Sequence, residues 1–345
     1  MALTNEVFSI NNRLMKYSFI FLFLAFFSLV SCQNIGGDKV ETIESLSTKL
    51  ESDPHNISLL RKRVELYKTA NNNDKAIADL QHCVNLAPDS ASYYIELADL
   101  FMTQGNVNNT LALLEKASQI DPKNVDIWLQ VSEIYLMYRK YNEVIKFANK
   151  ALDIDPFSDK AFFIKGYAFK ESESTDAAIR NFQECLKNNP NNYNANIELG
   201  GIYSKLNDEL AITYYNNAIA IDSANINSYY NLGLFYQNND YLNEAISTYN
   251  QIIEKDSTFP NSYYNIGYIY LELLKINDMA APYFSKAIEA KPDYKEAYFN
   301  RGLCFEEVGN ILQAQKDYKS SLKIDHNYKQ AIDGLNRVEE SLNSN

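Results

Sequence analysis

Apolar and polar residues alternate in a helical rhythm over residues 57–328, and the rhythm repeats about every 34 positions. In the stretch 125–158 the apolar positions form two sets: Trp128, Val131, Ile134 and Tyr135, followed by Val144, Ile145, Ala148, Ala151 and Ile154. Both sets have the three-and-four spacing of a helix that buries one face. Arg139 and Lys140 interrupt the pattern between them. Asp155-Pro156 ends the second set, because the residue before a proline is disfavoured in helical space. Each period is therefore predicted to be helix, turn, helix, turn.

Proline marks the end of the period. It occupies positions 54, 88, 122, 156 and 190 at a constant interval of 34, and the same slot then holds Ser223, Ser257, Pro292 and His326. A recurrence over nine slots that fills the chain predicts one elongated body made of stacked repeats, in which each repeat contacts only its neighbours.

These residues resemble the tetratricopeptide repeat, a 34-residue helix pair with a proline at position 32, aromatics at positions 4, 11 and 24, and small residues at positions 8, 20 and 27. Counting from Ile57, position 8 holds Ala98, Ser132, Gly166, Gly200, Gly233, Gly267 and Gly302 in repeats two to eight. Small residues are needed there because the two helices of a pair cross closely. Val64 is large for this slot in the first repeat, so we expect irregular packing at the start of the array.

The resemblance implies an all-α fold, a right-handed solenoid of about eight repeats whose first helices build the concave wall. The predicted repeats are 57–90, 91–124, 125–158, 159–192, 193–225, 226–259, 260–294 and 295–328. Residues 39–56 are interpreted as a lone helix before the array, and residues 329–345 as a capping helix after it. The fifth repeat lacks one residue near Asn207 and the seventh gains one near Asn277. We expect both changes in the turn between the two helices, where length variation costs little.

The N-terminus has the pattern of a bacterial lipoprotein signal, which we assign to residues 1–31. Lys16 precedes an apolar run from Tyr17 to about Val30, too short for the roughly 20 residues that span a bilayer. Residues 29–32, Leu-Val-Ser-Cys, resemble the lipobox, in which the chain is cut before a cysteine that is then lipidated. The resemblance makes Cys32 the lipidated residue and 32–38 a tether. An uncleaved N-terminal helix anchor is the alternative, and the pattern leaves open whether Met1 or Met15 is the true start.

Composition narrows the choice of partners. The chain is 46% hydrophobic and 22% charged, with a net charge of −12. Removal of residues 1–31 takes away Arg13, Lys16 and Glu6, a net +1, and leaves about −13. Such a charge argues against nucleic acid or an anionic lipid face as the main partner.

Chemistry-bearing residues are too few and too scattered to predict an enzyme. The only histidines are His55, His82 and His326, and no metal-ligand spacing, phosphate loop or nucleophile motif is present. Cys83 and Cys185 fall in the small-residue slot at position 27, and Cys304 lies on a first helix. We interpret all three as buried, small, apolar residues, and we predict no metal and no cofactor.

Positions 5 and 9 of the first helices project toward the concave wall in the tetratricopeptide repeat family, and position 6 adds asparagine in the last three repeats. The predicted partner-binding groove consists of Tyr230, Asn231, Tyr264, Asn265, Tyr268, Phe299 and Asn300. In repeat proteins that bind extended peptides, asparagines at this position grip the ligand backbone, since an amide both donates and accepts. The alternative is that the motif merely reflects a chain rich in asparagine.

The corresponding wall of the first repeats is acidic, with Glu65, Glu96, Asp99, Gln130 and Glu133. It is either a solvated face or a surface that receives a basic segment of a partner.

The sequence as a whole favours a membrane-anchored scaffold or adaptor of the bacterial cell envelope that faces the periplasm or the cell exterior. It would bind a protein or peptide, not nucleic acid, in its groove. A surface lipoprotein that captures carbohydrate on the groove tyrosines is the alternative function.

Overall fold

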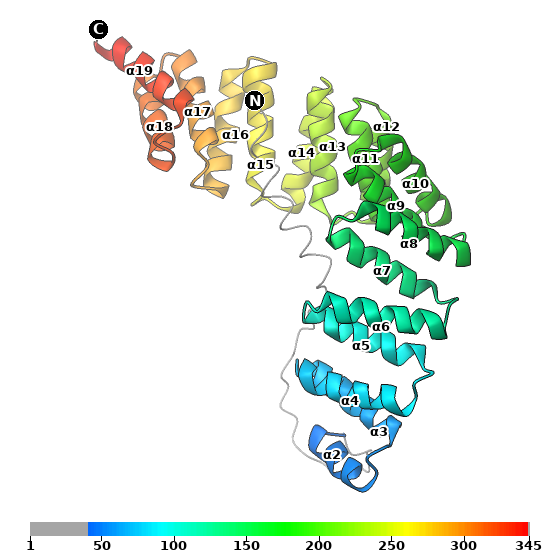
Figure 1. Cartoon of the computed structure of the whole chain (residues 1–345). Coiled ribbons are helices and arrows are strands. Elements are labelled where there is room, and N and C mark those ends of the chain that lie inside the picture. Colours follow the sequence, from blue (N-terminus) through cyan, green and yellow to red (C-terminus); the bar gives the residue numbers. More distant parts are fainter. Residues whose placement is uncertain (1–40, 344–345) are drawn as a thin grey trace, which may run out of the picture.

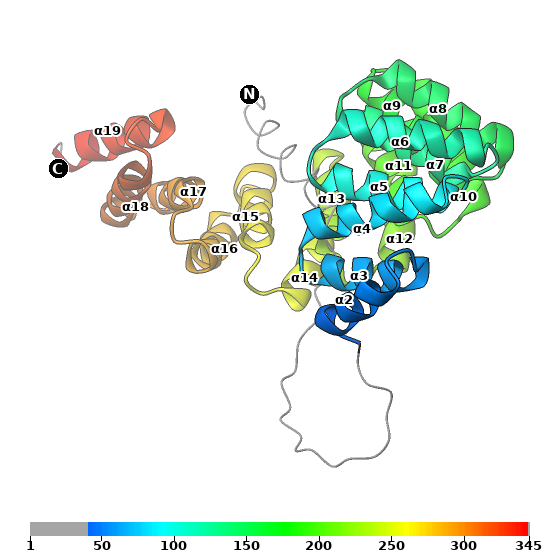
Figure 2. The same cartoon turned by 60° about the horizontal axis from the view of Figure 1, so that its bottom comes forward.

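The structure, a computed structural model, describes residues 41–343; residues 1–40, and Cys32 with them, lie outside the described range. Within that range the protein consists of eighteen α-helices and one π-helical segment, without a strand. The helices stack in chain order into one curved array, with α2 at one end and α19 at the other (Figure 1). Figure 2 shows the same array with its bottom turned forward, and α2 and α19 lie apart in this view as well. The predicted all-α solenoid is confirmed.

Eight antiparallel helix pairs make up the array. The first helices are α3 (Ile57–Thr69), α5 (Ala91–Thr103), α7 (Val125–Met137), α9 (Asp159–Glu171), α11 (Tyr193–Lys205), α13 (Ile226–Asn238), α15 (Pro260–Tyr268) and α17 (Lys295–Glu307). The second helices are α4 (Asn73–Leu86), α6 (Val107–Ile120), α8 (Tyr141–Ile154), α10 (Thr175–Asn188), α12 (Leu210–Ile221), α14 (Leu242–Lys255), α16 (Asn277–Ala290) and α18 (Ile311–Ile324). Before them lies α2 (Ile43–Ser52), and after them α19 (Lys329–Asn343).

The first helices form the inner, concave side of the array. Among the described residues, α7 packs on α9, α11 on α13 and α17 on α19, whereas no two second helices of successive repeats approach to a similar extent. Since the first helices lie closer together than the second helices, the array bends toward them. Residues on their free faces therefore line the concave wall.

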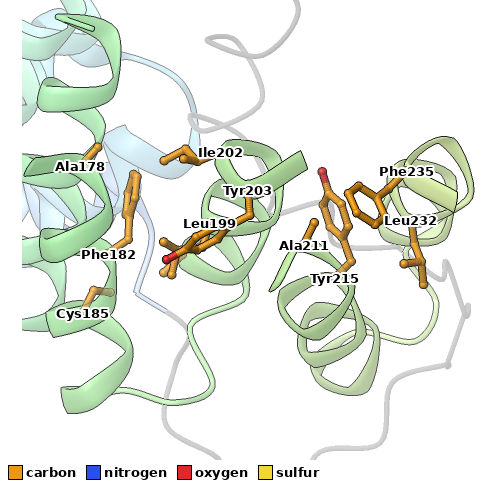
Figure 3. Packing of buried hydrophobic residues seen from close by; sticks show 11 residues of the cluster. Ala178, Phe182, Cys185, Leu199, Ile202, Tyr203, Ala211, Tyr215, Leu232 and Phe235 are labelled. Atoms are coloured by element: carbon orange, nitrogen blue, oxygen red, sulfur yellow. The ribbon is translucent and has the colours of Figure 1, made fainter. Parts of the chain in front are cut away.

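Complementary sizes near positions 8 and 24 hold the helix pairs of repeats four to eight together. A Cβ atom built on Gly267 would lie 2.9 Å from the ring of Phe284, so a glycine is what admits that ring. The same relationship joins four further pairs: Gly166 with Phe182, Gly200 with Tyr215, Gly233 with Tyr249, and Gly302 with Tyr318. Figure 3 shows Phe182 and Tyr215 within the continuous apolar core that crosses from α10 to α13.

In the first repeat, position 8 holds a larger residue than glycine and position 24 a smaller one than an aromatic ring. Val64 and Leu80 occupy these positions, and both are fully buried in one core cluster. The expectation of irregular packing at Val64 was therefore wrong, because the smaller Leu80 makes room for the larger Val64.

Each pair is joined by a turn with one residue in left-handed backbone space at position 15, or one residue later in the seventh repeat. These residues are Asn71, Gly105, Arg139, Glu173, Asn207, Asp240, Lys275 and Gly309. The amide of the next residue usually closes the turn on the carbonyl of position 11, as Asn72 N does on Tyr67 O at 2.8 Å. The turn thereby satisfies carbonyls that the helix end leaves free.

The two length changes are absorbed in different places. In the seventh repeat the extra residue lies in the π-helical segment η1 (Ile269–Leu273), where Leu274 N bonds to Ile269 O at 2.9 Å. The expected position near Asn277, in the turn, was wrong. A wider helical turn keeps Ile269 and Leu271 buried and so costs less than exposing them. The residue missing from the fifth repeat is lost at the end of the turn, as expected near Asn207. α12 begins at Leu210, and Ile212 N bonds to Glu209 O, three residues back.

Candidate functional site

The concave side of repeats six to eight carries one aromatic cluster per repeat. In the seventh repeat the Tyr264 ring lies between two others, with ring centroids 5.7 Å from Phe284 and 4.9 Å from Tyr294. The three rings occupy positions 5, 25 and 35 of this repeat, which correspond to positions 5, 24 and 34 of a repeat without the extra residue. The corresponding clusters are Tyr230, Tyr249 and Phe259 in the sixth repeat, and Phe299, Tyr318 and Tyr328 in the eighth. Tyr230, Tyr264 and Phe299 are thus half-buried and held in fixed orientations.

The last residue of each repeat is also the N-cap of the next first helix, and its chemistry changes along the chain. The side chains of Asn56, Asn124, Ser158, Asn192 and Asn225 each accept a hydrogen bond from the first turn that follows. Phe259 and Tyr294 occupy the same position before α15 and α17 and provide no such cap. Because a polar cap contributes about 1 kcal/mol to a helix, these two repeats give up local stability to place a ring on the concave side.

The three predicted asparagines are placed differently from one another. Asn300 donates a hydrogen bond from Nδ2 to the Tyr264 hydroxyl at 3.1 Å, so it links two successive repeats. Asn265 is only 7% exposed, and its Nδ2 has no hydrogen-bond partner among the described residues. Asn231 is half-buried. The Asn265 amide lies beside the buried Tyr249 hydroxyl, so of the three only Asn231 is accessible from the groove.

Hydroxyl groups in the groove remain protonated near neutral pH. Burial raises the pKa of Tyr264 and the pKa of Tyr294 well above the usual value for tyrosine, and it raises the pKa of Tyr328 to about 12. The Tyr294 hydroxyl donates to Oδ1 of Asn261 at 3.2 Å. The hydroxyls of these tyrosines can therefore form hydrogen bonds as neutral groups, but they cannot act as general bases.

Tyr268, the remaining predicted groove residue, ends α15 directly before η1 and is half-buried. The structure thus places all seven predicted residues on the first helices α13, α15 and α17. Their role as a binding site stays a prediction. Sequence reasoning missed the partner rings Phe259, Tyr294 and Tyr328, although an aromatic in place of Asn or Ser at the end of three successive repeats was a readable signal.

The acidic wall of the first repeats is largely neutralised by bases of neighbouring helices. Glu96 pairs with Arg61 at 2.8 Å and with Lys68 at 3.2 Å, and Lys68 also pairs with Glu65 at 3.1 Å. Glu133 pairs with Lys160 at 2.9 Å. Burial, reinforced by the negative charge of Glu96, raises the pKa of Asp99. Gln130 is half-buried on α7. Both interpretations of this wall stay open, but little of its charge is available without breaking an existing pair.

The three described cysteines are buried, as predicted. Cys83 and Cys185 are 0% exposed and Cys304 is 1% exposed. Burial raises the pKa of Cys185 and of Cys304 to about 12, so neither is a thiolate at neutral pH. His55 and His82 approach each other to 3.2 Å between ring nitrogens. No group of three or more potential metal ligands occurs within residues 41–343.

Comparison with family models decides the classification. Two models of the tetratricopeptide repeat match residues 62–90, 101–162, 159–192, 226–258, 260–294 and 295–328, well over half of the chain. The chain is a tetratricopeptide repeat protein. Proteins of this family generally mediate protein–protein interactions, and their fold is typically a non-enzymatic scaffold.

Solved structures agree with this fold. The C-terminal part of a tetratricopeptide repeat protein from Cytophaga hutchinsonii superposes with a TM-score of 0.62 at 18% identity, over 70% of this chain and 99% of that one. YrrB, described as having an unusual peptide-binding site, reaches 0.47 at 22% identity, over 53% of this chain and 95% of its own. MamA reaches 0.45 at 26% identity, over 49% and 92%. No curated protein matches this tetratricopeptide repeat protein.

Proposed function

We propose that this protein is a membrane-anchored scaffold of the bacterial cell envelope that binds an extended segment of a partner protein in the concave groove of repeats six to eight. The family supplies the general role, protein–protein interaction. The placement of the site, the anchor and the envelope location are the parts we add.

The replacement of polar N-caps by aromatic rings carries the proposal. A sequence that breaks a local rule in successive repeats usually gains something elsewhere, and functional sites are the common reason. Here the gain is a row of aromatic rings that is already ordered in the absence of a partner. Tyr294 packs on Tyr264, and Phe259 packs on Tyr230. Fixed aromatic surfaces bind with little loss of side-chain entropy.

Asn231 supports an extended peptide as the ligand. Its half-buried amide can pair with backbone groups, which an extended segment presents at every second residue on each side. Asn300 is less available for this role because it already donates to Tyr264.

The sharpest test restores the missing caps. In the double variant Phe259→Asn and Tyr294→Asn, each asparagine copies the cap that Asn192 and Asn225 provide, so the helices keep their stability while the groove loses two rings. A second variant, Asn231→Ala, removes the amide that is accessible from the groove. Tagged proteins purified from their own membranes should each lose partners that the native chain retains. Asn217→Ala, an exposed asparagine on α12, is the matched control. Unchanged partner capture by both groove variants, with native circular dichroism spectra, would contradict the proposed site.

The anchor is tested separately. We propose lipidation of Cys32, supported by the lipobox-like residues 29–32. Incorporation of a labelled fatty acid should be lost in Cys32→Ala, and the protein should leave the membrane fraction. The idea fails if Cys32→Ala still fractionates entirely with membranes. Within residues 41–343 no helix is long and apolar enough to cross a bilayer.

No observation favours the carbohydrate alternative. Sugars stack on free aromatic faces, whereas the rings of Tyr230, Tyr264 and Phe299 already pack against neighbouring rings in their own repeats.

A further inference from the structure

One turn of the array combines exposed apolar side chains with unpaired bases. The turn that joins α7 to α8 exposes two large apolar side chains, Met137 at 57% and Tyr138 at 54%, followed directly by the exposed bases Arg139 and Lys140. The equivalent residues of the second repeat, Thr103 to Asn106, are polar and uncharged. Both turns share the same backbone, with a left-handed residue at Arg139 and at Gly105. The difference between them therefore lies in side-chain chemistry alone.

An open cavity of about 440 Å³ adjoins this turn. It lies between the start of α6 and the end of α7, which are the most loosely packed consecutive helices of the described array. Its walls include Val107, Leu111, Ile134, Tyr135 and Tyr138, and Lys140 lies at its edge. The apolar surface of the turn thus continues inward between two repeats, which gives an apolar ligand more to contact than two side chains.

The two bases are free to bind an anion. Neither Arg139 nor Lys140 forms an ion pair with any residue of the described range, whereas several bases of the first helices do. In a chain with a net charge of −12, two adjacent unpaired bases beside exposed apolar residues form a local exception. Phosphate groups of lipids lie directly above an apolar layer and match this arrangement.

The position of the chain end favours a membrane as the occupant. Successive helices are antiparallel, and α2 is followed by a short turn into α3, so the start of α2 lies on the same edge of the array as every turn from a first to a second helix (Figure 1). Residues 33–40 would connect Glu41 to Cys32, and eight residues span at most about 29 Å. A lipid anchor at Cys32 would hold this edge, three repeats from the turn, close to the bilayer surface.

We propose that the turn of residues 137–140 docks on the membrane surface, with Met137 and Tyr138 entering the interface and Arg139 and Lys140 binding lipid phosphates. The inference rests on the proposed anchor at Cys32. It orients the array with its edge on the bilayer and leaves the concave groove free for a partner.

A fluorophore attached at Tyr138→Cys in the full lipidated chain tests the docking. The native cysteines 83, 185 and 304 are buried and do not compete for the label. Phe157→Cys is the matched control, because Phe157 is 74% exposed on the opposite edge of the same repeat. The probe is a vesicle of phosphatidylcholine and phosphatidylglycerol that carries a spin-labelled quenching lipid. Quenching at position 138 is expected to exceed quenching at position 157 several-fold.

The charge contribution is tested in the same vesicles. Adding Arg139→Asn and Lys140→Asn to the Tyr138→Cys chain keeps the turn, since Asn71 and Asn72 hold these positions in the first repeat. Quenching at position 138 should fall toward the control, and vesicles of phosphatidylcholine alone, whose phosphates are balanced by choline, should give part of this fall without the substitutions. Equal quenching at positions 138 and 157 in chains that float with the vesicles would overturn the docking and leave the anchor intact. Chains that fail to float would overturn both, and capture of partners in the groove is measured independently of either.

Discussion

Arg301 holds Asp317 through two parallel hydrogen bonds, from Nε at 2.7 Å and from Nη2 at 2.8 Å. Its third group, Nη1, reaches Ser285 of the preceding repeat at 3.0 Å. The first repeat contains the same triad, in which Arg63 binds Asp79 and Ser47 at nearly identical distances. The two triads brace the first and last repeats, and each connects a helix pair with the helix before it.

Breaking one partner of this pair should be costly. The side chain of Asp317 is 1% exposed, so Asp317→Ala leaves the guanidinium partly buried without its carboxylate. We expect a loss of roughly 3 kcal/mol, measured as the shift in the urea unfolding transition followed by circular dichroism.

The double variant Arg301→Leu with Asp317→Leu is the control for that experiment. It copies Leu97 and Leu113, which occupy the same two positions in the second repeat and pack in one apolar cluster. The double variant should recover most of the lost stability, because a well-packed apolar pair can replace a buried ion pair. A double variant as unstable as the single one would contradict this account.

The size match between Gly267 and Phe284 predicts a compensating pair of substitutions. Gly267→Ala forces a Cβ atom against the Phe284 ring, and should lower the melting temperature by several degrees, corresponding to about 1–3 kcal/mol. Adding Phe284→Leu recreates the Ala98 and Leu114 pair of the second repeat and should restore part of the loss. An unchanged melting temperature for Gly267→Ala would show that the helices do not approach as closely as described.

Backbone strain at Glu173 should be removable. Glu173 adopts φ of 61°, where only glycine is unstrained, and the equivalent residues Gly105 and Gly309 have open space around them. Glu173→Gly should therefore raise the free energy of unfolding by about 1 kcal/mol. Gly309→Ala, the reverse change in another repeat, should lower it by a similar amount. Chemical denaturation of both variants measures the difference, and equal effects in the same direction would exclude a backbone origin.

The last helix should loosen in acid. Burial alone would raise the pKa of Glu306, but hydrogen bonds from Arg337 of α19 and from Tyr318 outweigh burial and lower that pKa. Because the folded pKa is below the unfolded one, the stabilisation is complete above the unfolded value of about 4.3 and disappears as the pH falls through the folded value. Amide protection in α19 should therefore drop between about pH 5 and pH 3, and earlier than in α10. Glu306→Gln should show reduced protection at pH 7 and little further change in acid.

The sequence predicted the helix pairs because period, proline positions and small residues all describe interactions inside one repeat. It failed where a residue was considered without its partner. Val64 looked too large only because Leu80 was not considered with it. Phe259, Tyr294 and Tyr328 were overlooked because the end of a repeat was read as a turn, although in space it lies on the groove of the same repeat. The burial of Asn265 depends on packing between repeats, which no single repeat contains.

The π-helical segment at 269–273 and the tightened start of α12 have a consequence for how such a chain can change over generations. The gained residue is taken up within one helix and the lost one at the end of a turn, and the glycine–ring contacts on both sides keep their register. The fold therefore tolerates the insertion or deletion of a single codon inside a helix as well as in a turn. One repeat can vary in length while every neighbour continues to stack as before.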